Sequence, residues 1–143
     1  MEREKEGHTM LKILVALVLL AHGIGHVMGP LQVFKVATIN PTWAGDSWVL
    51  TGVTGQSVGQ AIGVVLWIAA LIGFAALAGV VLGWLPAAWW APLAIVASTL
   101  SLMGIALFPT AFPLMSTVGA VVVDIAVLAS VLWFHWAPAD IAA

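Results

Sequence analysis

The chain has 143 residues, of which 63% are hydrophobic and only 7% are charged, and its formal net charge is −2 at pH 7. Soluble domains carry roughly 25% charged residues, so this composition excludes an ordinary soluble domain and indicates a protein surrounded by membrane lipid. No Lys or Arg follows Lys35, which argues against a nucleic-acid partner because no basic surface is left to neutralise phosphates. Cysteine is absent, so thiolate ligands and Fe–S clusters are excluded.

Four apolar runs are each long enough to cross a membrane, because about 20 helical residues at 1.5 Å each span a hydrocarbon core of about 30 Å. These runs cover residues 10–28, 58–82, 89–108 and 112–136. The links between the last three runs are so short that neighbouring spans must be antiparallel. The sequence therefore predicts an all-α integral membrane protein, with a four-helix transmembrane bundle forming a single membrane domain over residues 1–143.

The longer connection, residues 29–57, contains Asn40-Pro41 and Gly45-Asp46 and reads as an ordered loop outside the membrane. Arg3, Lys5 and Lys12 flank the first span on its N-terminal side, whereas Lys35 alone follows it. By the positive-inside rule, both termini are expected in the cytoplasm and the loop outside the cell membrane. The tryptophans agree with two interfacial belts: Trp84, Trp89, Trp90, Trp133 and Trp136 on the inner side, and Trp43 and Trp48 on the outer side.

The first span holds two histidines, His22 and His26, four positions apart in an otherwise apolar run. Counting from Met10 places His22 roughly 18 Å and His26 roughly 24 Å above the inner face. Ionisable groups at that depth are costly and usually face the protein interior, so the pair is a candidate functional site.

The other spans bring polar side chains to similar depths. Asp124 is the one acid inside a predicted span and lies roughly 14 Å above the inner face, near the level of His22. Ser98 and Ser101 fall at comparable heights in the third span, and Gln60 lies near the level of His26.

Helical spacing places these groups on single faces, because residues three and four apart are neighbours on a helix surface. His22 and His26 share one face, Ser98 and Ser101 another, and Asp124 lies on a third with small residues. Rows of small residues also let helices approach closely in lipid. We expect a tight bundle with the polar stripes turned inward.

Three interpretations of the polar band stay open. In the first, His22, His26 and Asp124 hold a divalent metal ion, since two histidines and one carboxylate suit zinc or iron. In the second, the same three residues bind a small ligand, with Gln60, Ser98 and Ser101 around it. In the third, the side chains only hydrogen-bond to neighbouring helices and hold them together.

A buried carboxylate should be protonated or paired with an imidazolium, because an isolated charge in hydrocarbon is costly. The functional reading is that His22 and Asp124 share one proton, and that His26, near Gln60, connects them to the outer side. Bis-histidine haem is disfavoured because His22 and His26 point the same way, while His8 and His135 are expected at the cytoplasmic side. A single proximal histidine remains open.

The segment His22-Gly23-Ile24-Gly25-His26-Val27-Met28-Gly29 resembles a loose group of uncharacterised bacterial four-span membrane proteins with an HGxxH-type motif near the end of the first span. The layout over about residues 10–136 is also remotely similar to DoxX-type membrane proteins. The resemblance implies the four-span fold and singles out the histidine pair, and it implies no reaction.

Two functions follow as hypotheses, and no motif identifies an enzymatic reaction. The first is a small membrane protein whose His/Asp site binds a small hydrophobic ligand, a substrate or a metal. The second is a non-catalytic accessory subunit, packed in a homo-oligomer or a larger membrane complex. A cavity at the level of the histidines favours the first, and a filled bundle with a flat Gly/Ala face favours the second.

Overall fold

The computed structural model describes residues 2–138, with side chains from residue 6 onward. Residue 1 and residues 139–143, which belong to the predicted domain and include Asp140, lie outside the described residues. The described part of the chain is helical and contains no strand. Its elements are α1 (Glu2–Gly25), α2 (Met28–Val33), α3 (Leu50–Thr54), α4 (Gln56–Val81), the 3-10 helix η1 (Ala87–Trp89), α5 (Trp90–Leu107) and α6 (Leu114–Leu132).

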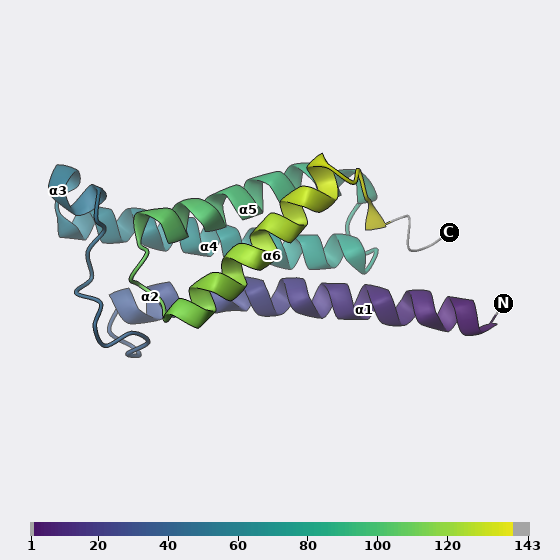
Figure 1. The fold of residues 1–143 in the computed structure, drawn as a ribbon, viewed down its shortest axis with the longest axis horizontal. Helices are drawn as coiled ribbons and strands as arrows, with labels where there is room; N and C mark the ends of the chain where they lie inside the picture. Colours follow the sequence, from purple (N-terminus) through teal and green to yellow (C-terminus); the bar gives the residue numbers. More distant parts are fainter. Residues whose placement is uncertain (1, 139–143) are drawn as a thin grey trace.

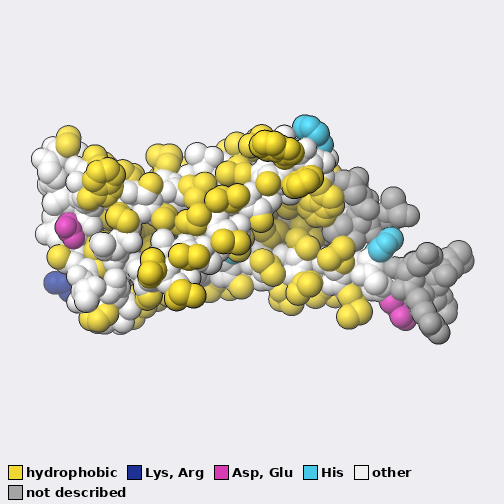
Figure 2. Space-filling view, in the orientation of Figure 1, with side chains coloured by type: hydrophobic (Ala, Val, Ile, Leu, Met, Phe, Trp, Pro, Cys, Tyr) yellow, Lys and Arg dark blue, Asp and Glu magenta, His cyan; other side chains and the backbone are white. Residues whose placement is uncertain are grey.

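Four helical segments are long and apolar enough to cross a membrane: Glu6–Val33, Gln56–Val81, Ala87–Leu107 and Leu114–Leu132. Helices α1 and α5 run in one direction and α4 and α6 in the other (Figure 1). On the face drawn in Figure 2, the charged side chains lie at the two ends of the molecule and apolar side chains cover the surface between them. These features indicate a membrane protein, as the composition predicted.

The connection predicted over residues 29–57 begins later in the structure, because the first span continues through α2 to Val33, and it contains the short helix α3. It is fastened to the end of α5. The Ser47 hydroxyl donates to the carbonyl of Leu107 at 2.7 Å, and the Trp48 indole N–H donates to the carbonyl of Ala106 at 2.7 Å. The last carbonyls of a helix have no partner within it, so these two side chains satisfy groups that α5 leaves open. The loop is thereby held against the bundle.

The first span is interrupted at His26, between α1 and α2, and Pro30 supplies the reason. Proline has no N–H and its ring collides with the carbonyl four residues earlier, which here belongs to His26. The chain tightens at this point: the N–H of His26 bonds to the carbonyl of Gly23 at 3.0 Å, and that of Val27 to Ile24 at 2.9 Å. These are bonds across three residues, which mark a short 3-10 turn. His26 therefore lies in a short turn between α1 and α2 rather than in a regular helix.

Helix α4 is the centre of the bundle, because it packs against α1, α2, α3 and α5, whereas α6 packs mainly against α5. The α4–α5 contact is close: a Cβ built at Gly73 would lie 2.7 Å from the Cβ of Ala97. Helices α1 and α6 are not among the closely packed pairs of the described residues. The bundle is therefore tight around α4, as the small residues predicted, and open along the α1–α6 seam, which they did not predict.

The close approach of α2 to α4 depends on Gly29. A Cβ at this position would overlap the ring of Trp67, which is itself fully buried. Gly29→Ala is expected to lower the free energy of unfolding by about 1–3 kcal/mol, the usual cost of overpacking a core. Gly119→Ala, on α6 with nothing within 4 Å of the new Cβ, is the matched control and should leave stability unchanged or slightly raised. Unfolding by SDS titration in mixed micelles measures both; equal stability of the two variants would contradict the packing argument.

Candidate functional site

A chain of hydrogen bonds joins three of the four long helices at the level of Asp124. His22 Nε2, from α1, and Asp124 Oδ1, from α6, share a hydrogen bond of 3.0 Å. The Ser101 hydroxyl, from α5, donates to Asp124 Oδ2 at 2.6 Å. Both carboxyl oxygens are therefore satisfied, which a side chain with 0% exposure requires. The predicted neighbourhood of His22, Ser101 and Asp124 exists in the structure.

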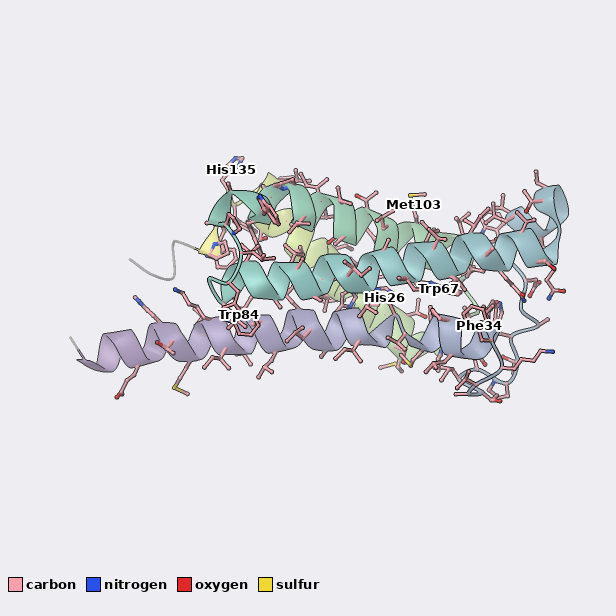
Figure 3. The ribbon with its side chains drawn as sticks, turned by 180° about the vertical axis from the view of Figure 1, so that it is seen from behind. His26, Phe34, Trp67, Trp84, Met103 and His135 are labelled. Atoms are coloured by element: carbon pink, nitrogen blue, oxygen red, sulfur yellow. The ribbon has the colours of Figure 1, made fainter. Side chains whose placement is uncertain are left out.

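His26 lies beside this network without joining it. Its ring is edge-on to that of His22, with the ring centroids 5.0 Å apart, and stacks on Phe74 at 6.2 Å. His26 is 5% exposed, and its Nε2 has no hydrogen-bond partner among the described residues. In Figure 3, His26 lies between the two ends of the bundle, with Phe34 toward one end and Trp84 and His135 at the other. A buried imidazole nitrogen without a partner is costly, and this one is also out of reach of solvent.

Both histidines line a cavity of about 170 Å³ between α1 and α6. Helix α1 contributes Ala21, His22, Gly25 and His26, and α6 contributes Ser116, Thr117 and Ala120. Met28, Ile105 and Phe112 complete the wall. An apolar cavity of about 150 Å³ accommodates a benzene ring, so this one has room for a group of that size.

Among the described residues, no Lys, Arg, Asp or Glu side chain lines the cavity, and His22 and His26 are its ionisable groups. Apolar and hydroxyl-bearing residues make up the rest of the wall. A charged ligand would therefore be left without a counter-charge, which is costly in a low-dielectric site.

Two of the predicted site residues lie elsewhere. Gln60 Nε2 donates to the carbonyl of Gly45 at 2.8 Å, and the side chain lines a separate hollow under the 29–57 loop. Ser98 is fully buried in α5, its hydroxyl has no partner among the described residues, and it does not line the cavity. The structure therefore does not bring Gln60 and Ser98 to the histidines, because depth along a helix leaves the direction of a side chain open.

The predicted metal-ligand set is not assembled either. Among the described residues, no group of three or more His, Cys, Asp or Glu side chains is placed so that it could hold a metal ion. His22 Nε2 and Asp124 Oδ1 bond to each other, and the His26 ring lies edge-on to His22 rather than converging with it on one point.

Several residues of the site were not named as site residues from the sequence. Ser116 and Thr117 line the cavity from the first turn of α6. Outside the cavity wall, the ring of Phe74 on α4 contacts His22 edge-on, with the ring centroids 4.3 Å apart. The spacing of Thr117 and Ala120 from Asp124, by multiples of a helical turn, was the signal that could have identified the α6 wall. No comparable signal pointed to Phe74.

Comparisons with protein-family models, with curated proteins and with solved structures found no match. The resemblance of the His22–Gly29 segment to four-span bacterial membrane proteins stays a hypothesis. The chemistry of the site must be argued from its own residues.

Two serines one helical turn apart on α5 test the hydrogen-bond network. Ser101→Ala removes the 2.6 Å bond to the buried Asp124 carboxyl group and is expected to lower the free energy of unfolding by about 1–3 kcal/mol. Ser98→Ala removes an equally buried hydroxyl that has no partner, so it should be neutral or stabilising. SDS titration of both variants measures the difference. Equal effects would mean that the Ser101–Asp124 bond does not contribute to stability.

Proposed function

We propose that this protein is a small multi-pass membrane protein whose intramembrane His/Asp site binds a small, largely hydrophobic and uncharged molecule. The observation that carries the proposal is the cavity of about 170 Å³ at the level of the histidines, which both imidazoles line. One polar group on the ligand, such as a hydroxyl or carbonyl, would hydrogen-bond to a polar side chain of this wall. The apolar body of the ligand would lie against the remaining wall.

In this proposal the Asp124 carboxyl group positions His22 rather than touching the ligand. Asp124 is fully buried behind His22, and its two oxygens are occupied by His22 and Ser101. Fixing one nitrogen of an imidazole determines the tautomer and the direction of the ring. His22 then presents a fixed edge of its ring to the cavity.

We further propose that the protein lies in the cell membrane with both termini in the cytoplasm and the 29–57 loop outside. The support is the bias of Arg3, Lys5 and Lys12 toward the N-terminal side of the first span. In the structure, α1 begins and α6 ends toward the same end of the molecule, which fits this arrangement (Figure 1). The cavity then lies in the half of the bundle nearer the loop.

The alternative function, an accessory subunit without a ligand, draws support from α6. Its outward face is largely unburied and exposes Leu114, Met115, Val118, Val122 and Ile125. These are large side chains and not the flat Gly/Ala face that close packing between helices in lipid favours. Lipid chains can cover such a surface as well as a partner can. The cavity at the level of the histidines therefore favours the ligand-binding function.

Benzyl alcohol, a six-membered ring with one hydroxyl, is a suitable probe for the cavity. In lipid nanodiscs, binding followed by saturation-transfer NMR is expected to weaken about tenfold or more in His22→Ala and in Asp124→Asn. The double variant should be no weaker than the worse single variant, because both changes disable one unit. Ser98→Ala is the control and should bind normally. Normal binding in the two single variants, additive losses, or no binding to the unaltered protein would each contradict the proposed site.

The orientation can be tested by labelling a single introduced cysteine, because the chain has none of its own. Asp46 is exposed in the loop, so Asp46→Cys is expected to react with a membrane-impermeant maleimide added to intact cells. His8→Cys, exposed at the start of α1, should react only after the cells are opened. The reverse pattern would show that the termini lie outside.

A further inference from the structure

The cavity of the histidines is one of two hollows on the same seam. Between α1 and α6, a second hollow of about 390 Å³ is lined by Leu14 and Val18 on one side and by Val122 and Ala126 on the other. Apart from Ser130 and the two indoles of Trp90 and Trp136, its walls are aliphatic. We call this hollow the seam groove.

The two hollows follow one another along the same pair of helices. On α1 the lining passes from Leu19 in the groove to Ala21 in the cavity, and on α6 from Val122 to Ala120. The lining of α1 from Leu14 to His26 covers about 18 Å at 1.5 Å per residue. The seam therefore offers a small polar pocket followed by a long apolar groove.

The seam is open on the outer surface of the bundle, because α1 and α6 do not pack closely along it. Figure 1 shows α6 crossing in front of α1, and the same face in Figure 2 is recessed and apolar between these helices. Leu14, Val18 and Val122 are 59%, 45% and 61% exposed. In a membrane this surface faces lipid chains, so a molecule dissolved in the bilayer can enter from the side.

We propose, on the basis of the proposed function above, that the ligand is a neutral single-chain lipid with a hydroxyl or carbonyl head. Its head lies in the cavity beside His26, and its chain lies in the seam groove. Three observations select this class: the imidazoles of the cavity wall can bond to one polar group, the wall has no Lys, Arg, Asp or Glu to pair with a phosphate or ammonium head, and an aliphatic groove lies next to the cavity along the same two helices. A double-chain phospholipid fits neither the small cavity nor its neutral walls.

A long-chain alcohol with a photoreactive diazirine near the end of its chain tests this proposal. The protein in nanodiscs is irradiated with photoreactive hexadecanol, and cross-linked peptides are identified by mass spectrometry. Cross-links are expected on the groove residues of α1 and α6, such as Leu14 and Val18, and should fall at least tenfold in His26→Phe. The matched probe is the same chain without its hydroxyl, which should label the groove at least tenfold less.

A pair of tryptophan variants on adjacent positions of α6 separates the groove from the helix surface. Ala126→Trp fills the groove from an exposed position, whereas Ile125→Trp adds the same side chain beside it, on a residue that does not line the groove. Ala126→Trp should abolish cross-linking by photoreactive hexadecanol and leave binding of benzyl alcohol unchanged. Ile125→Trp should change neither.

The outcomes distinguish the two proposals. If benzyl alcohol binds but the long-chain alcohol labels no groove residue, the lipid proposal is wrong and the small-ligand site stands. The lipid proposal is also wrong if the probe without a hydroxyl labels the groove equally, or if labelling is undiminished in His26→Phe. Either result would mean that the groove holds only ordinary bilayer lipid. If benzyl alcohol does not bind, the proposed function itself fails.

Discussion

The buried hydrogen bond between His22 and Asp124 ties the last helix of the bundle to the first. It joins α1 to α6, two helices that otherwise do not pack closely, and it occupies a carboxyl oxygen that no solvent can reach. In an apolar surrounding a buried carboxyl group without partners would cost several kcal/mol, so Asp124 holds α6 in a position where His22 and Ser101 both reach it. The diagonal course of α6 across the bundle is compatible with that requirement.

A second constraint acts on the first span and separates the roles of its two histidines. Pro30 has no N–H to donate to the His26 carbonyl, and a short turn separates α1 from α2. In a regular helix, His22 and His26 would stack along one face and could converge on a single partner. In the turn, the His26 ring is edge-on to His22 and stacks on Phe74. One imidazole is thus paired with Asp124, while the Nε2 of the other has no hydrogen-bond partner among the described residues.

The open seam between α1 and α6 bears on how the proposed ligand would reach the histidines. A closed bundle would isolate its polar groups from lipid and admit ligands only through its ends. Here the loop that follows the first span is fastened over the end of α5, whereas the side between α1 and α6 stays unpacked. The proposed ligand would therefore reach the histidines from the side of the bundle. A cavity wall without Lys, Arg, Asp or Glu agrees with an uncharged ligand.

Composition and periodicity predicted a helical chain with four segments able to span a membrane and antiparallel neighbours. These features follow from the sequence because they depend on the length and polarity of local runs. Depth counted along the helices also brought His22, Ser101 and Asp124 to one level. The direction of each side chain was beyond such counting: Ser98 and Gln60 share the predicted depth but turn elsewhere. Only the tertiary structure revealed the unpaired nitrogen of His26, the cavity and the groove. The nitrogen lies in the turn before Pro30. The cavity and the groove lie between α1 and α6, which are joined by the bond between His22 and Asp124, 102 residues apart in the sequence, and are not closely packed on either side of it.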